Sequence, residues 1–517
     1  MFTMDTVHLG LSLVSVLGAA ATYVRDKHRQ SATTLLRFYE QAILLVIGHL
    51  VYNVFFHPLR KFPGPKLWAA SRIPWCYYQY QGQLHYQLLE LHIQYGHVIR
   101  VAPNELSYTD ERAWKAIYGH RKEEMGKDPI FRLHTPTGAQ NILVADRETH
   151  TRQRRLLAHA FSESALREQE PILQLYARKL LDQLSRQCNK DPLNIVAWLT
   201  FASFDLIGHM SFGENFGCLD KGDYAPFVQA ITAMASELTF NQMWKYWGVM
   251  GIRKYFTPKG LVGQRVKHIK TAMQMVNRRI ENGSEHRDFL HYILSANDEK
   301  SMSDAEINVN AFSLNIAGSE STATALSGAA FFMLTHPPVY ERLVKEVRLA
   351  HADEDEITLA STHKLEYLDA VIVETLRMYP PVAITLPRRV PVGGEMIAGE
   401  FVPADTTVGV HHYSMYYHPE NFHQPGEFLP ERWLPGTRDA PPFANDKKEC
   451  MQPFSFGPRN CLGKNIARAE MRLLFAKLLF RFDWQLKPGQ EQWSRQKVQG
   501  FWQKKPLYCT LTPATRS

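Results

Sequence analysis

Apolar positions recur every three or four residues through long stretches of this chain, which is the spacing of one face of an α-helix. The clearest stretches are residues 171–184, 308–334, 337–350 and 365–378. Apolar runs typical of strands are shorter and fewer, at residues 98–101, 396–401 and 406–410. From residue 67 onward there is no repeat and no low-complexity linker. We therefore predict one catalytic domain over residues 67–517, mainly α with a minor β region.

The first apolar segment of the chain has the composition of a membrane span. Residues 7–24 are almost wholly apolar, close to the roughly 17–25 residues that cross a bilayer. A cleaved signal peptide is the alternative, but Arg25, Lys27 and Arg29 follow the run instead of preceding it, and the small-residue cleavage pattern is lacking. We expect residues 7–24 to span.

A second apolar segment covers residues 43–56, where His49 and Asn53 interrupt it. Its length favours an interfacial segment or a marginal second span. We assign residues 1–56 to a membrane anchor and the Pro-rich residues 57–66 to a hinge, although a Pro-rich loop is equally compatible.

The basic residues between the two apolar segments predict the orientation of the protein. Positive loops tend to remain in the cytoplasm, so we expect a single span and a catalytic domain on the cytosolic face of the endoplasmic reticulum membrane. The sequon that begins at Asn282 provides a test, since a glycan there would place the body in the lumen.

Composition limits the function further. The formal net charge is +8, and the chain has no zinc-finger or RNA-binding signature, so we expect a membrane surface or an acidic protein as partner and no nucleic acid. The six cysteines are scattered without a CxxC pair, which favours a reducing compartment.

One of these cysteines, Cys461, lies in the sequence FSFGPRNCLG directly before a predicted helix. Backbone N–H groups and the positive end of a helix dipole favour a thiolate over a thiol there. Gly457 and Gly463 permit tight turns and the close approach of a flat ligand. Arg459 can pair with an anionic group beside that ligand. A lone cysteine is more often a buried structural residue, so the prediction depends on the whole motif.

That motif resembles the haem-binding loop of the cytochrome P450 family, with matching positions at Phe454, Gly457, Arg459, Cys461 and Gly463. The resemblance runs from about residue 56 to the C-terminus. It implies the cytochrome P450 fold preceded by an N-terminal membrane anchor, haem b as cofactor, and Cys461 as axial ligand of the haem iron. The general description of a thiolate that assists O–O cleavage comes from this family itself.

Three further motifs match the family in order. Glu374 and Arg377 lie three residues apart in an apolar helix, and Arg432 follows in FLPERW. By resemblance they form a structural triad for folding and haem retention. Buried charges of this kind need partners.

The sequence AGSEST, residues 317–322, occupies the family's oxygen-activating position. Glu320 and the hydroxyls of Ser321 and Thr322 are implied to deliver protons. The family normally has Thr where Ser321 stands. Without the Cys461 loop, a helix-packing patch of small residues would be the simpler interpretation.

The third match concerns basic residues. By resemblance His150 and Arg154 contact a haem propionate, as do Arg388 and Arg459, because guanidinium groups pair well with carboxylates. Taken singly, each could equally be a solvated charge.

The resemblance implies a monooxygenase that activates O2 and oxidises a lipophilic small molecule. The chain has no flavin or nicotinamide segment, so electrons are expected from an NADPH-cytochrome reductase, with a cytochrome b-type protein as a further donor. The anchor is similar to that of microsomal enzymes of fungal secondary metabolism, which act on terpenoids, polyketides and alkaloids. A same-fold desaturase, ring-closing enzyme or isomerase is the alternative, and a haem-binding sensor or carrier is less favoured.

Two surfaces remain as hypotheses. A helical stripe of Lys464, Arg468 and Arg472 is expected to help dock an acidic reductase. By resemblance to the family, the substrate pocket is expected to be lined by Phe131 and nearby residues, Asn315, residues 382–385 and the region near Phe501.

Overall fold

The computed structural model describes residues 31–121, 123–131, 138–248, 274–279, 281, 287–295 and 302–514. The predicted span at residues 7–24 and the sequon at Asn282 lie outside these residues.

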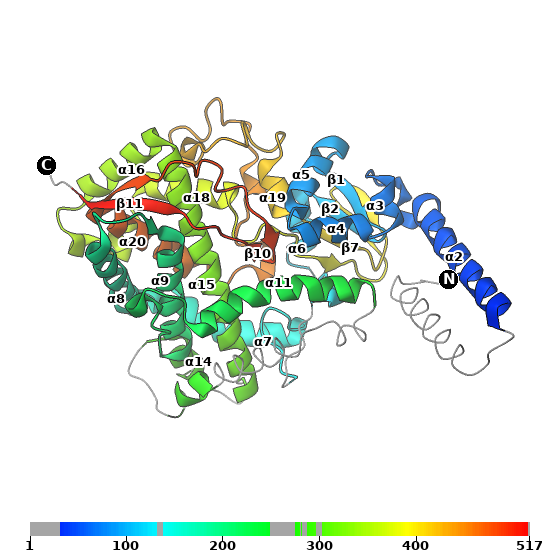
Figure 1. Cartoon of the computed structure of the whole chain (residues 1–517), viewed down its shortest axis with the longest axis horizontal. Helices are drawn as coiled ribbons and strands as arrows, with labels where there is room; N and C mark the ends of the chain where they lie inside the picture. The colour runs from blue at the N-terminus through cyan, green and yellow to red at the C-terminus, as the bar shows by residue number, and fades with distance from the viewer. Residues whose placement is uncertain are drawn as a thin grey trace.

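Helices dominate the described structure (Figure 1). Their bounds are α2 Ser31–Phe55, α3 Lys66–Ala70, α4 Ile73–Gln81, α5 Leu84–Tyr95, α6 Arg112–Tyr118, α7 Arg147–Ala158, α8 Glu163–Gln187, α9 Ile195–Phe212, α10 Cys218–Lys221, α11 Pro226–Tyr246, α14 Phe289–Ser295, α15 Asp304–Thr335, α16 Pro337–Ala350, α17 Leu359–Thr362, α18 Glu366–Met378, α19 His412–Tyr417 and α20 Lys464–Arg481. The four long helices predicted from periodicity are present within α8, α15, α16 and α18.

Local sequence explains where the central helices begin. Ser303 caps α15 through a capping box, in which its side chain accepts from the N–H of Glu306 and the Glu306 side chain accepts from the Ser303 N–H. Pro337 stands at the first position of α16, where its missing N–H costs no hydrogen bond. Helix α9 packs along α15 and is buried on nearly all sides, so these two helices form the centre of the hydrophobic core.

The β component is small. The strands are β1 Val98–Ala102, β2 Glu105–Tyr108, β3 Leu193–Asn194, β4 Arg388–Arg389, β5 Glu395–Ile397, β6 Glu400–Val402, β7 Thr407–Val410, β8 Phe482–Leu486, β9 Val498–Gln499, β10 Phe501–Trp502 and β11 Tyr508–Pro513. A four-stranded sheet has the order β1-β2-β7-β4, in which β2 and β7 are parallel. A three-stranded antiparallel sheet has the order β3-β11-β8.

One strand prediction was wrong. Residues 396–401 do not form a single strand but the hairpin of β5 and β6, paired from Glu395 opposite Val402 to Ile397 opposite Glu400. The turn needs positive φ at Ala398 (50°) and Gly399 (92°). Alanine rarely adopts that conformation, so the sequence carried no turn signal at its position.

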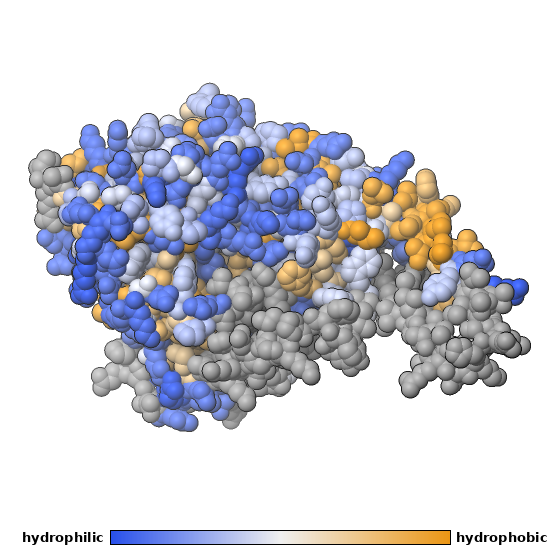
Figure 2. Space-filling model, in the orientation of Figure 1, coloured by the Kyte–Doolittle hydropathy of each residue, from blue (hydrophilic) through white to orange (hydrophobic). Residues whose placement is uncertain are grey.

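Helix α2 projects from the body beside α3, and Figure 2 shows hydrophobic side chains gathered over it. Its stretch Arg37–Phe55 is long and apolar enough to cross a membrane, and only 6% of it is buried. The predicted segment 43–56 is therefore part of a longer helix than its apolar run indicated. Helix α9 meets the same length and composition test, but 94% of it is buried, as expected for a core helix.

The Pro-rich segment after α2 packs against the body. Leu59 and Phe62 are buried in the main core, and the backbone N–H of Arg100 in β1 donates to the carbonyl of Pro63 at 2.7 Å. The side chain of Arg100 reaches back to the Asn53 carbonyl in α2 at 2.8 Å. These contacts join the Pro-rich segment and the end of α2 to β1.

Candidate active site

The loop that carries Cys461 is held tightly between α6 and α20. Its backbone closes through the Cys461 N–H, which donates to the Phe454 carbonyl at 2.8 Å. Gly457 has φ 73°, and a Cβ there would overlap the carbonyl oxygen of Tyr118 at the end of α6. Gly457 is thus required by the turn and by its close contact with the backbone of Tyr118. At Gly463, which precedes α20, a Cβ would make only ordinary contacts with protein atoms, so packing within the described protein does not itself require glycine there.

Cys461 differs from the other cysteines in its accessibility. All six are free thiols; Cys461 is exposed, and Cys188 is intermediate, whereas Cys76, Cys218, Cys450 and Cys509 are buried. Protein atoms still surround the loop, and this burial raises the pKa of the Cys461 thiol, although the Gly463 N–H and the charges of Arg154 and Lys464 oppose it. The predicted net preference for thiolate is therefore not present in the protein alone. A metal ion bound by this thiol would supply the missing stabilisation, because metal coordination deprotonates a thiol.

Two predicted basic residues lie one turn apart on α7. Asp146 caps this helix by accepting from the Thr149 N–H at 2.9 Å, and the spacing of four residues places His150 and Arg154 on one face. The Arg154 guanidinium donates to the carbonyl of Asn460 and, at 2.6 Å, to its side-chain oxygen. Arg154 thereby joins α7 to the residue before Cys461.

A cluster of basic side chains surrounds His150. Burial lowers the pKa of His150 to about 3, assisted by the positive charges of Arg459, Lys127, Arg154 and Arg388. Lys127 was not predicted, and no sequence motif marks it; it meets Arg388 through an isolated β-bridge. Burial, then Arg388 and Arg459, lower the pKa of Lys127 to about 7.

This cluster suits an anionic ligand. Arg388 is 5% exposed, and its Nη1 has no hydrogen-bond partner within the described residues. Arg459 is already paired with Glu124 and donates to the Ala145 carbonyl at 2.9 Å, so it is less free than predicted. Burying a guanidinium without a hydrogen-bond acceptor destabilises the protein unless an anion pairs with it. The propionate carboxylates of haem are suitable anions.

The middle of α15 carries the AGSEST sequence. Ala317 is exposed and Ser321 half-exposed, although most of this helix is buried, so both can border a ligand. The Ser321 hydroxyl donates to the Ala317 carbonyl one turn earlier. Thr322 is 3% exposed and faces the packed side of the helix. Of the two hydroxyls, Ser321 therefore has the accessible position.

Glu320 is 4% exposed and has a partner that sequence reasoning missed. Its Oε1 accepts from the ammonium of Lys504, in the segment after β10. Lys504 also donates to the hydroxyl of Thr324 at 3.0 Å.

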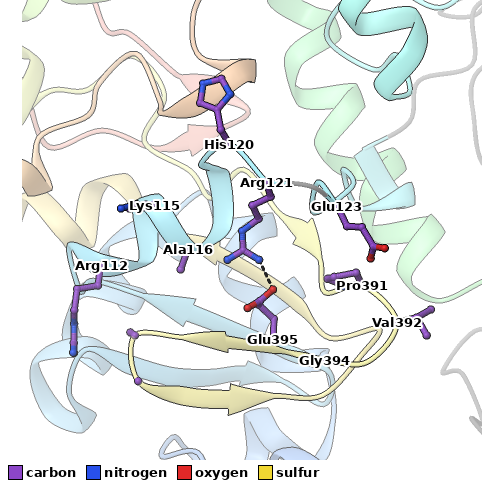
Figure 3. A pocket seen from close by; sticks show the side chains of 12 residues that line it. Arg112, Lys115, Ala116, His120, Arg121, Glu123, Pro391, Val392, Gly394 and Glu395 are labelled. Atoms are coloured by element: carbon purple, nitrogen blue, oxygen red, sulfur yellow. Dashed lines mark hydrogen bonds and ion pairs between the residues drawn. The ribbon is translucent and has the colours of Figure 1, made fainter.

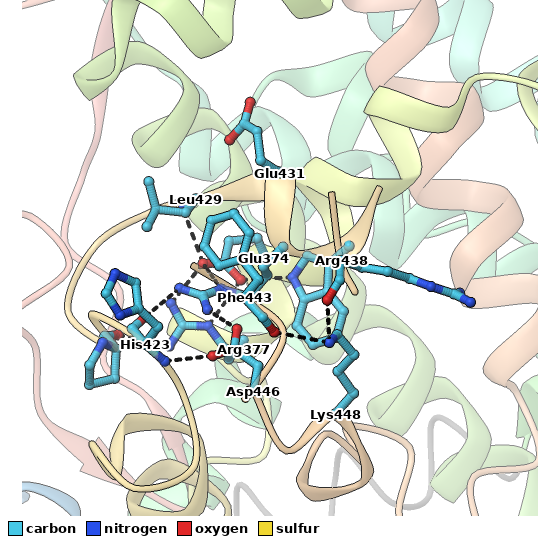
Figure 4. A network of polar contacts seen from close by, with 12 residues as sticks. Glu374, Arg377, His423, Leu429, Glu431, Arg438, Phe443, Asp446 and Lys448 are labelled. Atoms are coloured by element: carbon cyan, nitrogen blue, oxygen red, sulfur yellow. Dashed lines mark hydrogen bonds and ion pairs between the residues drawn. The ribbon is translucent and has the colours of Figure 1, made fainter. Parts of the chain in front are cut away.

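The three predicted triad residues meet in one buried network, in which Figure 4 labels Glu374 and Arg377. Arg377 donates to both oxygens of Glu374 at 2.7 and 2.9 Å, and Arg432 donates to Oε1 at 3.1 Å. All three side chains are 0% exposed. Burial alone raises the pKa of Glu374, but Arg377 and Arg432 outweigh it and the pKa is lowered. Asp446, which the sequence did not suggest, pairs with Arg432 and brings the network to zero net charge.

The other residues singled out from the sequence differ in exposure and in their contacts. Asn315 is fully buried, and its side-chain amide has no hydrogen-bond partner among the described residues. The side chain of Phe131 lies outside the described part. Arg472 is 12% exposed and pairs with Asp369 at 3.1 Å, whereas Lys464 is exposed. Only part of the predicted basic stripe is therefore free on the surface.

A shallow surface groove of about 700 Å³ lies between α6 and the β5–β6 hairpin (Figure 3). Its centre is crossed by the ion pair of Arg121 and Glu395. No predicted site residue lines it, and it contains neither Cys461 nor Glu320. We do not assign the chemistry to this groove.

The comparison with known proteins agrees with the motifs. Residues 63–511 match the family model described as cytochrome P450. Cytochrome P450 monooxygenase astJ of Aspergillus oryzae is 41% identical over 474 residues, which cover 90% of this chain and 94% of that protein. Trichothecene C-15 hydroxylase of Fusarium sporotrichioides is 40% identical, with 91% and 96% covered, and averantin hydroxylase of Dothistroma septosporum is 38% identical, with 99% and 98% covered. The chain belongs to the cytochrome P450 family, and it is a haem-dependent monooxygenase that oxidises small molecules.

Proposed function

We propose that Cys461 is the axial ligand of the haem iron. The observation that carries the assignment is its exposed thiol in a closed loop, beside a basic cluster that includes an unpaired, buried Arg388. Cys450 is the only other cysteine near this motif, but it is 0% exposed and burial raises the pKa of its thiol. His150, Arg154, Lys127 and Arg388 would hold the propionates, with Arg459 stabilising the loop through Glu124. The haem, when bound, supplies reductive activation of O2.

The polar residues of α15 are proposed to bring protons to that reaction. Ser321 holds a hydroxyl at the accessible face, and its bond to the Ala317 carbonyl fixes the direction of that hydroxyl. Glu320 precedes Ser321 and lies about 100° from it around the helix axis. We expect it to exchange protons with solvent on the side of the helix away from the ligand. Because Thr322 is buried, Ser321 takes the role that threonine usually has in the family. The Glu374 network is proposed to maintain the fold around the haem.

The substrate is proposed to be a lipophilic secondary metabolite, such as a terpenoid, polyketide or alkaloid, and the product a hydroxylated form of it. Two relatives are named as hydroxylases, which favours oxygen insertion over desaturation, ring closure or isomerisation. Half-exposed Val382, Ile384, Thr385 and Phe501 supply mainly apolar side chains for such a ligand.

The N-terminal helices are proposed to anchor the enzyme in the endoplasmic reticulum membrane with the body in the cytosol. The exposed apolar side chains of α2 support this, as do Leu67, Ile73, Tyr77 and Tyr80, which are between 56% and 75% exposed on the neighbouring α3 and α4. Lys464 and Arg468 are proposed to help dock the NADPH-cytochrome reductase, and a cytochrome b-type protein could use the same surface.

Product analysis by mass spectrometry tests the function. Microsomes containing the enzyme and a reductase are supplied with terpenoid, polyketide and alkaloid scaffolds, with and without NADPH. We expect an NADPH-dependent product heavier by one oxygen atom. A product lighter by two hydrogens would replace hydroxylation by desaturation or ring closure, and an NADPH-independent isomer of the substrate would refute the monooxygenase assignment for that substrate.

A further inference from the structure

The acid in the middle of α15 depends on a cation from the last part of the chain. Lys504 and Glu320 form an ion pair whose side chains are 8% and 6% exposed. The same ammonium donates to Thr324, one turn after Glu320, at 3.0 Å. Surface ion pairs contribute little, but the two members of a buried pair each require the other, because an isolated charge is expensive among protein atoms.

The backbone on both sides of Lys504 is fixed. Trp502, two residues earlier, is buried and stacks on Tyr379 with ring centroids 4.3 Å apart. On the other side, the N–H of Lys505 donates to the side-chain oxygen of Gln496 at 3.2 Å. The ammonium of Lys504 is therefore presented to α15 from a defined position and not from a loosely held tail.

No second cation is recorded against Glu320 within the described residues. The other titratable groups that sense its charge are Tyr224 and Tyr379, on segments packed beside α15. Burial raises the pKa of both phenols, and Glu320 raises it further, so both are neutral at physiological pH. Within the described residues, Lys504 is thus the cation that balances the charge of the Glu320 carboxylate. The hydroxyl of Thr324 lies within hydrogen-bonding distance of both side chains.

We propose that Lys504 is a positioning residue for proton delivery, whose ion pair holds the Glu320 carboxylate away from the Ser321 face until a proton is taken up. This inference rests on the proposed role of Glu320. The Glu320 carboxylate takes up a proton from a solvent hydronium ion, and the neutral acid turns away from Lys504, whose ammonium keeps its hydrogen bond to Thr324. The acid then gives that proton toward Ser321, which restores the carboxylate and the ion pair. The proton comes from solvent, and no electrons are transferred in this step.

The perturbation is Lys504→Met, with Lys504→Arg as the conservative variant and Lys505→Met as the matched control. Lys505 is exposed, and no ion pair of its side chain is recorded among the described residues. The measured quantity is the fraction of NADPH electrons that appear in product, as a function of pH. In K504M the buried carboxylate has no counter-charge and holds its proton more firmly. We expect coupling at neutral pH to fall on the order of tenfold, within the range of general acid–base effects, and to recover as pH rises.

K504R should retain most of the coupling, and K505M should match the parent. The difference in pH dependence separates a role in proton delivery from a merely structural one, because a packing defect would lower coupling equally at all pH values. The CO complex of the reduced enzyme monitors haem ligation in every variant.

The Glu320→Gln variant distinguishes a failure of the proposed role of Glu320 from a failure of the inferred role of Lys504. If E320Q couples normally, the proposed role of Glu320 fails, and Lys504 then has no proton path to position. If E320Q is uncoupled while K504M resembles K505M at every pH, the inference about Lys504 alone is overturned. The double variant E320Q/K504M carries no lone buried charge, so it decides the matter even if K504M loses its haem. Coupling in this variant equal to that of E320Q supports the inference, and a further loss overturns it.

Discussion

Removing the carboxylate at the centre of the buried network should destabilise the whole catalytic domain. Glu374 is fully buried and accepts hydrogen bonds from Arg377, Arg432, the N–H of Leu429 and the indole of Trp433. In Glu374→Gln the two guanidinium groups face a neutral amide whose NH2 group can only donate. At an effective dielectric constant of about 20, each charge contact is worth roughly 4 kcal/mol before the desolvation of the carboxylate is subtracted. Breaking a buried pair of this kind costs a net ~3–5 kcal/mol.

The assay is urea unfolding of E374Q, followed by far-UV circular dichroism and by the loss of the haem absorbance. Glu431→Gln is the matched control, because Glu431 is near the same network but is 34% exposed and pairs with the 52% exposed Arg342. That substitution should change the free energy of unfolding by less than about 1 kcal/mol. If the two variants differ by less than about 1 kcal/mol, the network does not stabilise the fold as its geometry indicates.

Three further outcomes are expected. Burial raises the pKa of Glu470 to about 8, so the folded protein retains a proton that the unfolded chain releases above its ordinary pKa of 4.5, and stability falls as pH rises between these values. Glu470→Gln should therefore be more stable, by up to ~4 kcal/mol at pH 8 and progressively less toward pH 5, and a difference that is constant with pH in thermal unfolding would disprove this. Arg388→Gln should release haem faster to a haem-free acceptor protein than Arg389→Gln does, since Arg389 is already paired with Asp128 at 3.0 Å, and equal rates would remove Arg388 from the cofactor site. Reversing Lys464 and Arg468 to Glu should slow reduction by the reductase and weaken its dependence on ionic strength without changing the haem spectrum, and unchanged stopped-flow kinetics would exclude this docking surface.

Sequence patterns predicted the features that depend on local spacing. Helix α16 was predicted at its observed bounds because its apolar period and its initial proline are both local signals. The turn between β5 and β6 was missed because an alanine adopts positive φ there, which nothing in the composition suggests.

The site likewise contains some features that local motifs predict and others that only the folded structure reveals. The position of Cys461 and the pairing of Glu374 with Arg377 follow from short motifs. Lys504 is 184 residues from Glu320, and Asp446, although only 14 residues from Arg432, belongs to no motif that pairs it with an arginine, so only the folded arrangement shows either contact. Charge balance was the one signal available for Asp446, since two arginines and one glutamate cannot be neutral in a buried cluster.

The most direct test of the account compares the CO complexes of the reduced enzyme in Cys461→Ser and Cys450→Ser. Both variants are expressed with haem supplied and examined by absorption spectroscopy for the Soret band of thiolate-ligated haem. We predict that C461S loses this band. C450S should retain it, because residue 450 is buried and is not the proposed ligand. Retention of the band in C461S together with its loss in C450S would contradict the central assignment.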